Sequence, residues 1–152
     1  MENFEKYMKK ALALAKKAAE LDEVPVGAVV VKGGKIIGSG YNKKNATANP
    51  FLHAEMIAMT KACKKIGDWR LNECDLYVTL EPCPMCAGAI INARVKRVIF
   101  GAYDPKAGCT GSLYNLPEDR RFNHRAEIVG GIMEKECGAV LTEYFKRKRK
   151  EG

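Results

Sequence analysis

The sequence contains no long apolar segment. None of its apolar runs approaches the ~20 residues that a helix needs to cross a bilayer, and its first residues, Met1–Tyr7, lack the charged-then-apolar layout of a secretory signal peptide. We therefore expect no membrane association and a cytoplasmic location. Internal repeats and linkers are also absent, and the one low-complexity segment is a basic tail. The 152 residues are predicted to form a single domain, 1–152, that ends in a basic helix.

Charge and cysteine content narrow the class of protein further. The chain has 26 Lys and Arg residues against 18 Asp and Glu residues, a formal net charge of +8. Such an excess favours a polyanionic partner but does not indicate a fold. Six cysteines are present. In a secreted protein an even number suggests disulfides, whereas a Cys-x-x-Cys pair in a cytosolic protein indicates metal or redox chemistry.

Hydrophobic periodicity and turn residues predict alternating helices and strands. Gly33-Gly34, for example, is typical of the turn of a β-hairpin. The predicted elements are, in order, helix 2–20, strands 26–31 and 35–41, loop 42–52, helix 53–65, strand 75–80, helix 84–93, strand 95–101, loop 102–125, strand 128–132 and helix 134–149. This order predicts an α/β fold with one mixed sheet, covered by helices on both faces.

Two short motifs, His53-Ala54-Glu55 and Pro82-Cys83-Pro84-Met85-Cys86, contain the candidate metal ligands. Cysteines three residues apart at the start of a helix place both sulfurs on one side, and the helix N-terminus favours their thiolate form. His53 would complete a set of three zinc ligands. A structural zinc site normally has four protein ligands, whereas a catalytic one keeps a position for water, whose pKa the metal lowers toward ~7.

Glu55 is the candidate proton-transfer residue, because it lies two positions from His53 without being needed as a ligand. Residues two apart do not share a face in mid-helix, so both can address the metal only at a helix entrance. Other readings stay open at this point. A Cys-x-x-Cys pair also suits a redox site or half of a structural zinc site, whose fourth ligand would be His124 or another cysteine.

Together with several further segments, these motifs resemble the bacterial tRNA-specific adenosine deaminases of the cytidine and deoxycytidylate deaminase superfamily. The similar segments are Glu23–Ala28, Asn42, His53–Glu55, Leu76–Gly88, Gly101–Lys106, Gly111–Leu113 and Phe122–Arg125. The resemblance implies a three-layer α/β/α cytidine-deaminase-like fold with a central mixed five-stranded sheet. It also implies a homodimer, one Zn²⁺ per chain, and hydrolytic deamination of adenosine to inosine at the wobble position of a tRNA anticodon.

The resemblance further implies a set of substrate-binding residues. Asn42 matches the asparagine that hydrogen-bonds the target base, although alone it reads as a turn residue. Asp104 matches a residue near the nucleotide backbone, although Asp-Pro alone reads as a turn. Residues expected in the same role are Ala54, Asn123, His124 and Arg125.

The end of the last helix is a second candidate for RNA contact. Its run of five basic residues, 146–150, follows two aromatic residues, Tyr144 and Phe145. A charge run is usually a solvated helix end, but lysine and arginine also contact phosphates, and aromatic rings stack on unpaired bases. We therefore expect Tyr144, Phe145 and Arg147 to contact the anticodon stem-loop of a tRNA, most simply an arginine tRNA.

Two alternatives remain open from the sequence. A deaminase of a free nucleobase or nucleotide, of the cytosine or guanine type, would use the same zinc chemistry in a closed pocket. A non-catalytic, zinc-stabilised RNA-binding module would have no need of Glu55. The basic tail argues against the first and Glu55 against the second.

Overall fold

Five strands form one mixed sheet in the order β2-β1-β3-β4-β5. The structure is a computed structural model that describes residues 3–151. The strands are β1 (Gly27–Lys32), β2 (Lys35–Tyr41), β3 (Asp75–Leu80), β4 (Arg97–Ala102) and β5 (Glu127–Val129). The pairs β1–β2 and β1–β3 are antiparallel, whereas β3–β4 and β4–β5 are parallel. The expected mixed five-stranded sheet is therefore confirmed.

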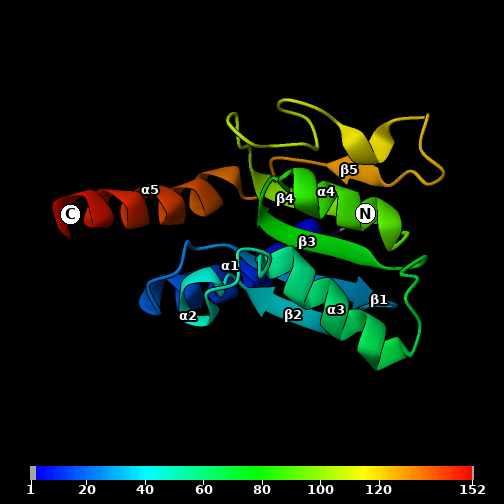
Figure 1. Ribbon diagram of the computed structural model, residues 1–152, viewed down its shortest axis with the longest axis horizontal. Helices are drawn as coiled ribbons and strands as arrows, with labels where there is room; N and C mark the ends of the chain where they lie inside the picture. Colours follow the sequence, from blue (N-terminus) through cyan, green and yellow to red (C-terminus); the bar gives the residue numbers. More distant parts are fainter. Residues whose placement is uncertain (1–2, 152) are drawn as a thin grey trace.

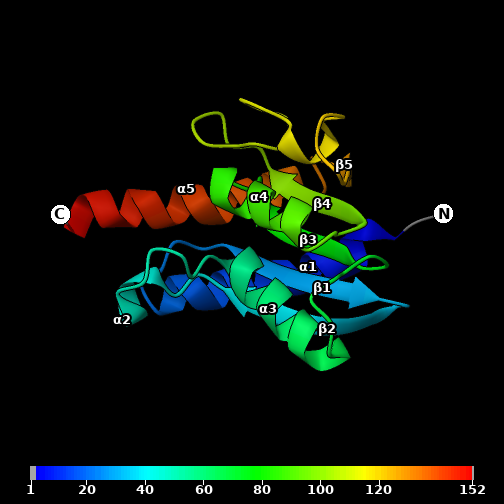
Figure 2. The ribbon, with the colours of Figure 1, turned by 45° about the vertical axis from the view of Figure 1, so that its right-hand side comes forward.

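Helices cover both faces of this sheet (Figures 1 and 2). The helices are α1 (Phe4–Glu20), α2 (Lys44–Thr47), α3 (Ala54–Ile66), α4 (Pro84–Asn92) and α5 (Glu134–Glu151), with a 3-10 turn, η1, at Leu116–Glu118. Strand residues alternate between two cores, as the pleat requires. Val30 and Val78 face the core beneath α3, whereas Val29 and Tyr77 face the core beneath α1 and α5. This is the predicted three-layer α/β/α arrangement.

Several predicted element boundaries were wrong. Strand 95–101 is observed at Arg97–Ala102, because Val95 N–H still bonds the last turn of α4 at Ile90 O. Strand 128–132 is only Glu127–Val129, because the chain turns at Gly131, whose φ is 84°. The first helix begins at Phe4, with Asn3 as its N-cap, and the predicted residue 2 lies outside the described residues. The last helix continues past 149 to Glu151.

Two predicted loops contain short helical turns. Loop 42–52 includes α2, and loop 102–125 includes η1. The short turn η1 is the longest helical element in the connection between β4 and β5, so residues 103–126 form an unusually long irregular segment. Such segments are uncommon in compact domains and often functional. Among residues 3–151, no helix combines the length and apolar character needed to span a bilayer.

Candidate active site

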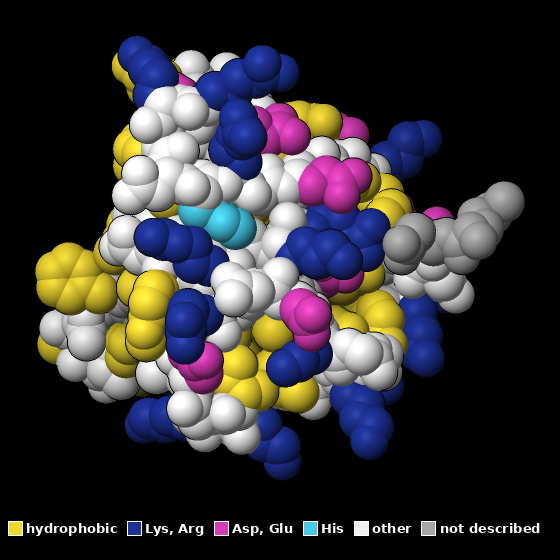
Figure 3. Space-filling view, turned by 90° about the vertical axis from the view of Figure 1, so that its right-hand side faces the viewer, with side chains coloured by type: hydrophobic (Ala, Val, Ile, Leu, Met, Phe, Trp, Pro, Cys, Tyr) yellow, Lys and Arg dark blue, Asp and Glu magenta, His cyan; other side chains and the backbone are white. Residues whose placement is uncertain are grey.

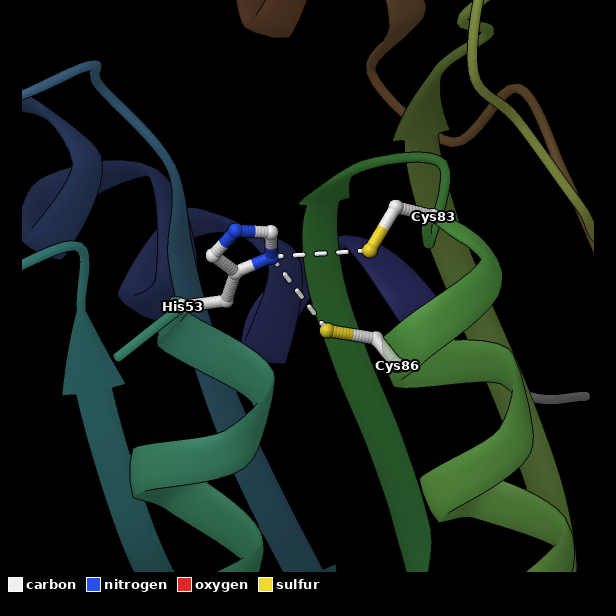
Figure 4. Close-up of side chains that lie close together, drawn as sticks. All are labelled: His53, Cys83 and Cys86. Atoms are coloured by element: carbon white, nitrogen blue, oxygen red, sulfur yellow. Dashed lines mark hydrogen bonds between the residues drawn. The ribbon is translucent and has the colours of Figure 1, made fainter. Parts of the chain in front are cut away.

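The starts of α3 and α4 meet beyond the end of β3, and their first residues form the candidate metal site (Figure 4). His53 is the N-cap of α3 and Cys83 is the N-cap of α4, both with extended backbone. Pro84 occupies the first turn of α4, where a missing N–H has no cost. Cys86 lies in the same turn. Each motif therefore lies at a helix entrance, the placement at which His53 and Glu55 can address one point.

Three donor atoms converge there. His53 Nδ1 lies 3.5 Å from Cys83 Sγ and 3.5 Å from Cys86 Sγ. In the described part of the chain, these residues are the one group of at least three histidine, cysteine or acidic side chains whose ligand atoms lie within 4.8 Å of one another. One imidazole nitrogen and two sulfurs fit zinc. His124 is not a fourth donor to this set. Its Nε2 lies 2.6 Å from the carbonyl oxygen of Val95, which precedes the first residue of β4, at the end of the strand away from the donor set.

The thiols and the imidazole influence one another's titration. A hydrogen bond from Cys86 lowers the pKa of Cys83 to about 4, while that same contact and burial raise the pKa of Cys86. The hydrogen bond with Cys83 raises the pKa of His53. The pair thus holds one thiolate readily, and the positive ends of two helices favour negative charge at the same point.

Glu55 lies in the first turn of α3 and is 4 % exposed. Burial raises the pKa of its carboxyl group to about 7. It therefore exchanges a proton near neutral pH, as a general acid–base residue requires. Its carboxyl group contacts the Cys86 thiol but does not belong to the donor set.

A pocket of about 180 Å³ opens above these residues. Drug-sized ligands occupy roughly 300–1,000 Å³, so this pocket suits a smaller group such as one nucleobase. Its lining includes His53, Glu55 and Cys83 and the following further residues: Val24, Val26, Asn42, Lys44, Leu80, Glu81, Asp104 and Ala107. Lys44, Glu81 and Ala107 were not among the predicted site residues. Glu81 lies within the similar segment Leu76–Gly88, but nothing in that segment assigned it a role.

The pocket adjoins a wider groove of about 820 Å³. The groove shares Val24, Leu80, Asp104 and Ala107 with the pocket and extends to Tyr103, Lys106 and the α5 residues Leu141, Phe145, Lys148 and Arg149. A small pocket that opens into a large, partly basic groove suits one base with flanking nucleotides better than a free base in a closed site.

Of the predicted substrate-binding residues, Asn42 and Asp104 line the pocket. Asn42 Oδ1 accepts a 2.8 Å hydrogen bond from Ala54 N–H, so its NH₂ group is the part that it can offer to a base. Ala54 is fully buried and its N–H already donates to Asn42. It therefore supports the position of Asn42 and has no free N–H to offer to a base. The Asp104 carboxylate accepts bonds from Lys106 N–H and Ala107 N–H, so the expected turn is also present.

The predicted contacts of α5 separate into two groups. Phe145 is 43 % exposed and lines the groove. Tyr144 is 6 % exposed and its hydroxyl donates to Asp22 O, so its ring is not open to a base and the expected stacking is corrected for this residue. Arg147 donates to Ala19 O, a contact that fastens α5 to the end of α1, and within α5 its guanidinium group lies over the Tyr144 ring.

The lining of the pocket does not include Asn123, His124 or Arg125. His124 is held at Val95 O, which precedes β4, whereas Glu55 and the donor set lie beyond the other end of the sheet. Six strand residues at ~3.3 Å each separate these ends by about 20 Å.

Figure 3 shows the face of the molecule on the right of Figure 1, where Lys and Arg side chains are interspersed with acidic and apolar ones.

Comparison with known proteins assigns the family. Residues 2–149 match the MafB19-like deaminase family. The chain is 52% identical over 147 residues to a tRNA-specific adenosine deaminase of Bacillus subtilis, which covers 97% of this chain and 91% of the relative. The chain belongs to the tRNA-specific adenosine deaminase family. The expected resemblance is therefore confirmed.

Solved structures of deaminases share its fold. A tRNA:A34 deaminase, from a study of A-to-I editing at the wobble position of transfer RNA, matches with a TM-score of 0.86 and 40% identity over 90% of this chain and 99% of that one. A guanine deaminase from Bacillus subtilis matches with a TM-score of 0.64 and 43% identity over 67% of this chain and 66% of that one.

Proposed function

We propose that this member of the tRNA-specific adenosine deaminase family hydrolyses adenosine to inosine at the wobble position of a tRNA anticodon. The observation that carries the proposal is the position of Glu55. It is a buried, non-ligand carboxyl group beside a three-donor set, at the base of a one-base pocket that opens into a basic groove.

His53, Cys83 and Cys86 would hold one Zn²⁺ per chain. A zinc ion with three protein ligands makes a bound water acidic enough to act as a nucleophile at neutral pH. Glu55 accepts one proton from the attacking water and delivers it to N1 of adenine while the water oxygen bonds to C6. It then accepts the remaining proton of the new C6 hydroxyl group and delivers it to the amino group, so that the C6–N bond breaks, ammonia leaves and the C6 carbonyl forms. The overall reaction consumes adenosine and water and yields inosine and ammonia. The Asn42 NH₂ group hydrogen-bonds and orients the base.

The substrate adenosine would be presented in a single-stranded anticodon loop, where extrusion of a base costs less than in a duplex. Phe145 and Arg149 in the groove would contact the flanking nucleotides by stacking and by phosphate binding. The stem-loop of an arginine tRNA is the first substrate to test. A tRNA substrate supports a cytoplasmic location.

We also propose that the chain acts as a single deaminase domain in a homodimer. An apolar hollow of about 320 Å³ between α3 and α4 supports the dimer, and Met56, Met59, Cys63, Ala89 and Ala93 contribute to its lining. Ala87 and Ile90 of α4 do not contribute to this lining, because both are fully buried. A second protomer would also let Asn123, His124 and Arg125 approach an RNA bound at the other site. Light scattering at micromolar concentration tests the dimer, and a monomer mass would refute it.

The deciding experiment is inosine formation on an arginine-tRNA anticodon stem-loop, on free adenosine and on a stem-loop with another wobble base. We expect turnover of the first substrate alone. The likeness to a guanine deaminase supplies the second candidate, deamination of free guanine. Efficient release of ammonia from guanine, without activity on the stem-loop, would select that alternative.

A further inference from the structure

Glu81 is a buried carboxylate that the proposed chemistry leaves without a role. It follows β3, precedes the Pro82-Cys83 step and is 2 % exposed. Burial of a carboxylate is costly unless hydrogen bonds compensate it. A buried glutamate next to a metal motif therefore requires a set of donors, and those donors indicate what the residue holds.

All four hydrogen bonds recorded for its carboxylate come from one segment, residues 104–112. Oε1 accepts from Asp104 N–H at 2.9 Å and from the Ser112 hydroxyl. Oε2 accepts from Thr110 N–H at 3.1 Å and from Ser112 N–H at 2.8 Å. The carboxylate thus fixes both ends of the segment, which belongs to the long irregular connection between β4 and β5.

The middle of the segment passes directly over the same carboxylate at Gly108. A Cβ atom at this position would lie 2.2 to 2.4 Å from the carboxyl atoms of Glu81, closer than any side chain tolerates. Cys109 N–H also bonds Pro82 O, beside Glu81 in the chain. The segment therefore takes its shape from Glu81 and from the absence of a side chain at residue 108.

This segment forms one wall of the base pocket. Asp104 and Ala107 line the pocket opposite Asn42 and Lys44, and the backbone of Asp104 is bonded directly to Glu81. We propose that Glu81 is a positioning residue for the deaminase, acting through Asp104 on the binding of the nucleotide. This inference rests on the proposed function for its substrate, but the anchoring itself does not.

The opposite wall is fixed in the same way by a second glutamate. Glu23 is 2 % exposed and accepts hydrogen bonds from Asn45 N–H at 3.0 Å and from Ala46 N–H at 2.8 Å. These amides belong to α2, whose first residue, Lys44, lines the pocket. Glu23 therefore serves as an internal comparison, because it anchors the other wall without touching Asp104.

The first test measures anchoring without activity. In zinc-loaded protein, Glu81→Gln replaces one acceptor oxygen by an NH₂ group, which cannot accept from an N–H donor. Amide hydrogen exchange should then accelerate in residues 104–112 and stay unchanged in α2, whereas Glu23→Gln should show the reverse. Unchanged exchange in 104–112 would overturn the anchoring.

The second test measures the coupling to the substrate in a double-mutant cycle with Asp104→Ala. We expect Glu81→Gln to keep one zinc per chain and to lower kcat/KM for the stem-loop by on the order of 10²-fold, mainly through KM. The double variant should have a kcat/KM for the stem-loop no lower than that of the less active single variant. Losses that multiply would overturn the proposal, whereas a parent protein that makes no inosine would instead refute the proposed function.

A second substitution, which leaves the buried carboxylate in place, tests the proposal if Glu81→Gln fails to fold. Gly108→Ala keeps the carboxylate but displaces the segment, so it should raise KM in the same way. Gly138→Ala in α5 is its matched control, because a Cβ there meets nothing within 4 Å. Normal KM values for Gly108→Ala would count against the proposal.

Discussion

Asn42 Oδ1 accepts the N–H of Ala54, the first residue of α3. One side chain thus caps the helix that carries Glu55 and also faces the base pocket. The two roles use different atoms, because the oxygen caps the helix and only the NH₂ group can donate to a base.

Asn42→Asp separates these roles. The aspartate keeps an acceptor for Ala54 N–H and loses the donor, so stability should stay within about 1 kcal/mol of the parent, while kcat/KM for the stem-loop falls by roughly 10–100-fold. Asn42→Ala should lose both, with about 1 kcal/mol of additional destabilisation. Thermal unfolding and steady-state inosine assays measure the two effects. An aspartate variant with parental activity would exclude Asn42 from base recognition.

Glu55→Gln should abolish turnover without loss of metal. The amide is similar in shape but cannot carry the proton, and general acid–base residues contribute ~10²–10⁴-fold. Because Glu55 acts in several steps, the loss should lie at or beyond the upper end. Zinc content per chain and stem-loop affinity should match the parent. Loss of zinc from this variant would identify Glu55 as a ligand and contradict its assignment.

The buried carboxyl group of Glu55 also predicts a dependence of stability on pH after zinc is removed with a chelator. Its pKa rises on folding from 4.5 to about 7, so the folded state binds the extra proton between these values and loses stability as pH rises through them. The Glu55→Gln variant has no such ionisable group and does not lose stability in this way. The difference in unfolding free energy between the variant and the parent should therefore grow in favour of the variant by about 3 kcal/mol between pH 4.5 and 7. Denaturant unfolding at a series of pH values measures it, and a constant difference would contradict the assigned shift.

Metal binding should require the three donor residues and tolerate loss of the other cysteines. Cys83→Ser and Cys86→Ser are expected to lose the stoichiometric zinc and all deaminase activity. Cys63→Ser is the matched control, because Cys63 is only half-buried and belongs to the opposite end of α3. Metal analysis with X-ray absorption should give two sulfur ligands and one nitrogen ligand from the protein. A third sulfur would indicate a closed, structural site.

Two arginines of α5 should behave differently. Arg149 lines the groove, so Arg149→Gln should weaken stem-loop binding and reduce the slope of log K against log salt by about 1. Arg147 bonds Ala19 O, so Arg147→Gln should instead lower stability by about 1 kcal/mol and leave the slope unchanged. Binding titrations at several salt concentrations separate them. Equal slopes for both variants would contradict the placement of RNA in the groove.

The metal site was predictable because its geometry is local. His53 and Glu55 at one helix start, and Cys83 and Cys86 at another, follow from short motifs whose residues are neighbours in the chain. The mixed sheet with helices on both faces also followed from the pattern of elements, whereas its strand order was not predicted. Short-range signals thus predicted both the mixed sheet and the three residues whose donor atoms converge.

Contacts between distant segments were not predictable in this way. Nothing near Glu81 in the sequence indicates that it holds residues 104–112, and nothing near Glu23 indicates α2. Tyr144 reads as a surface aromatic beside basic residues, but its place depends on Asp22, more than a hundred positions away. Such roles depend on which backbone amides the fold brings to a buried carboxylate or hydroxyl group.

The three metal donors come from different halves of the sheet. His53 follows the antiparallel hairpin β1–β2, whereas the cysteines follow β3 and begin the parallel half. A metal ion bound to them acts as a cross-link, because it closes the chain between residues 53 and 83 and limits the freedom of the unfolded state. Zinc affinity would then contribute to folding as well as to reactivity, and a chelator would act on this protein partly as a denaturant.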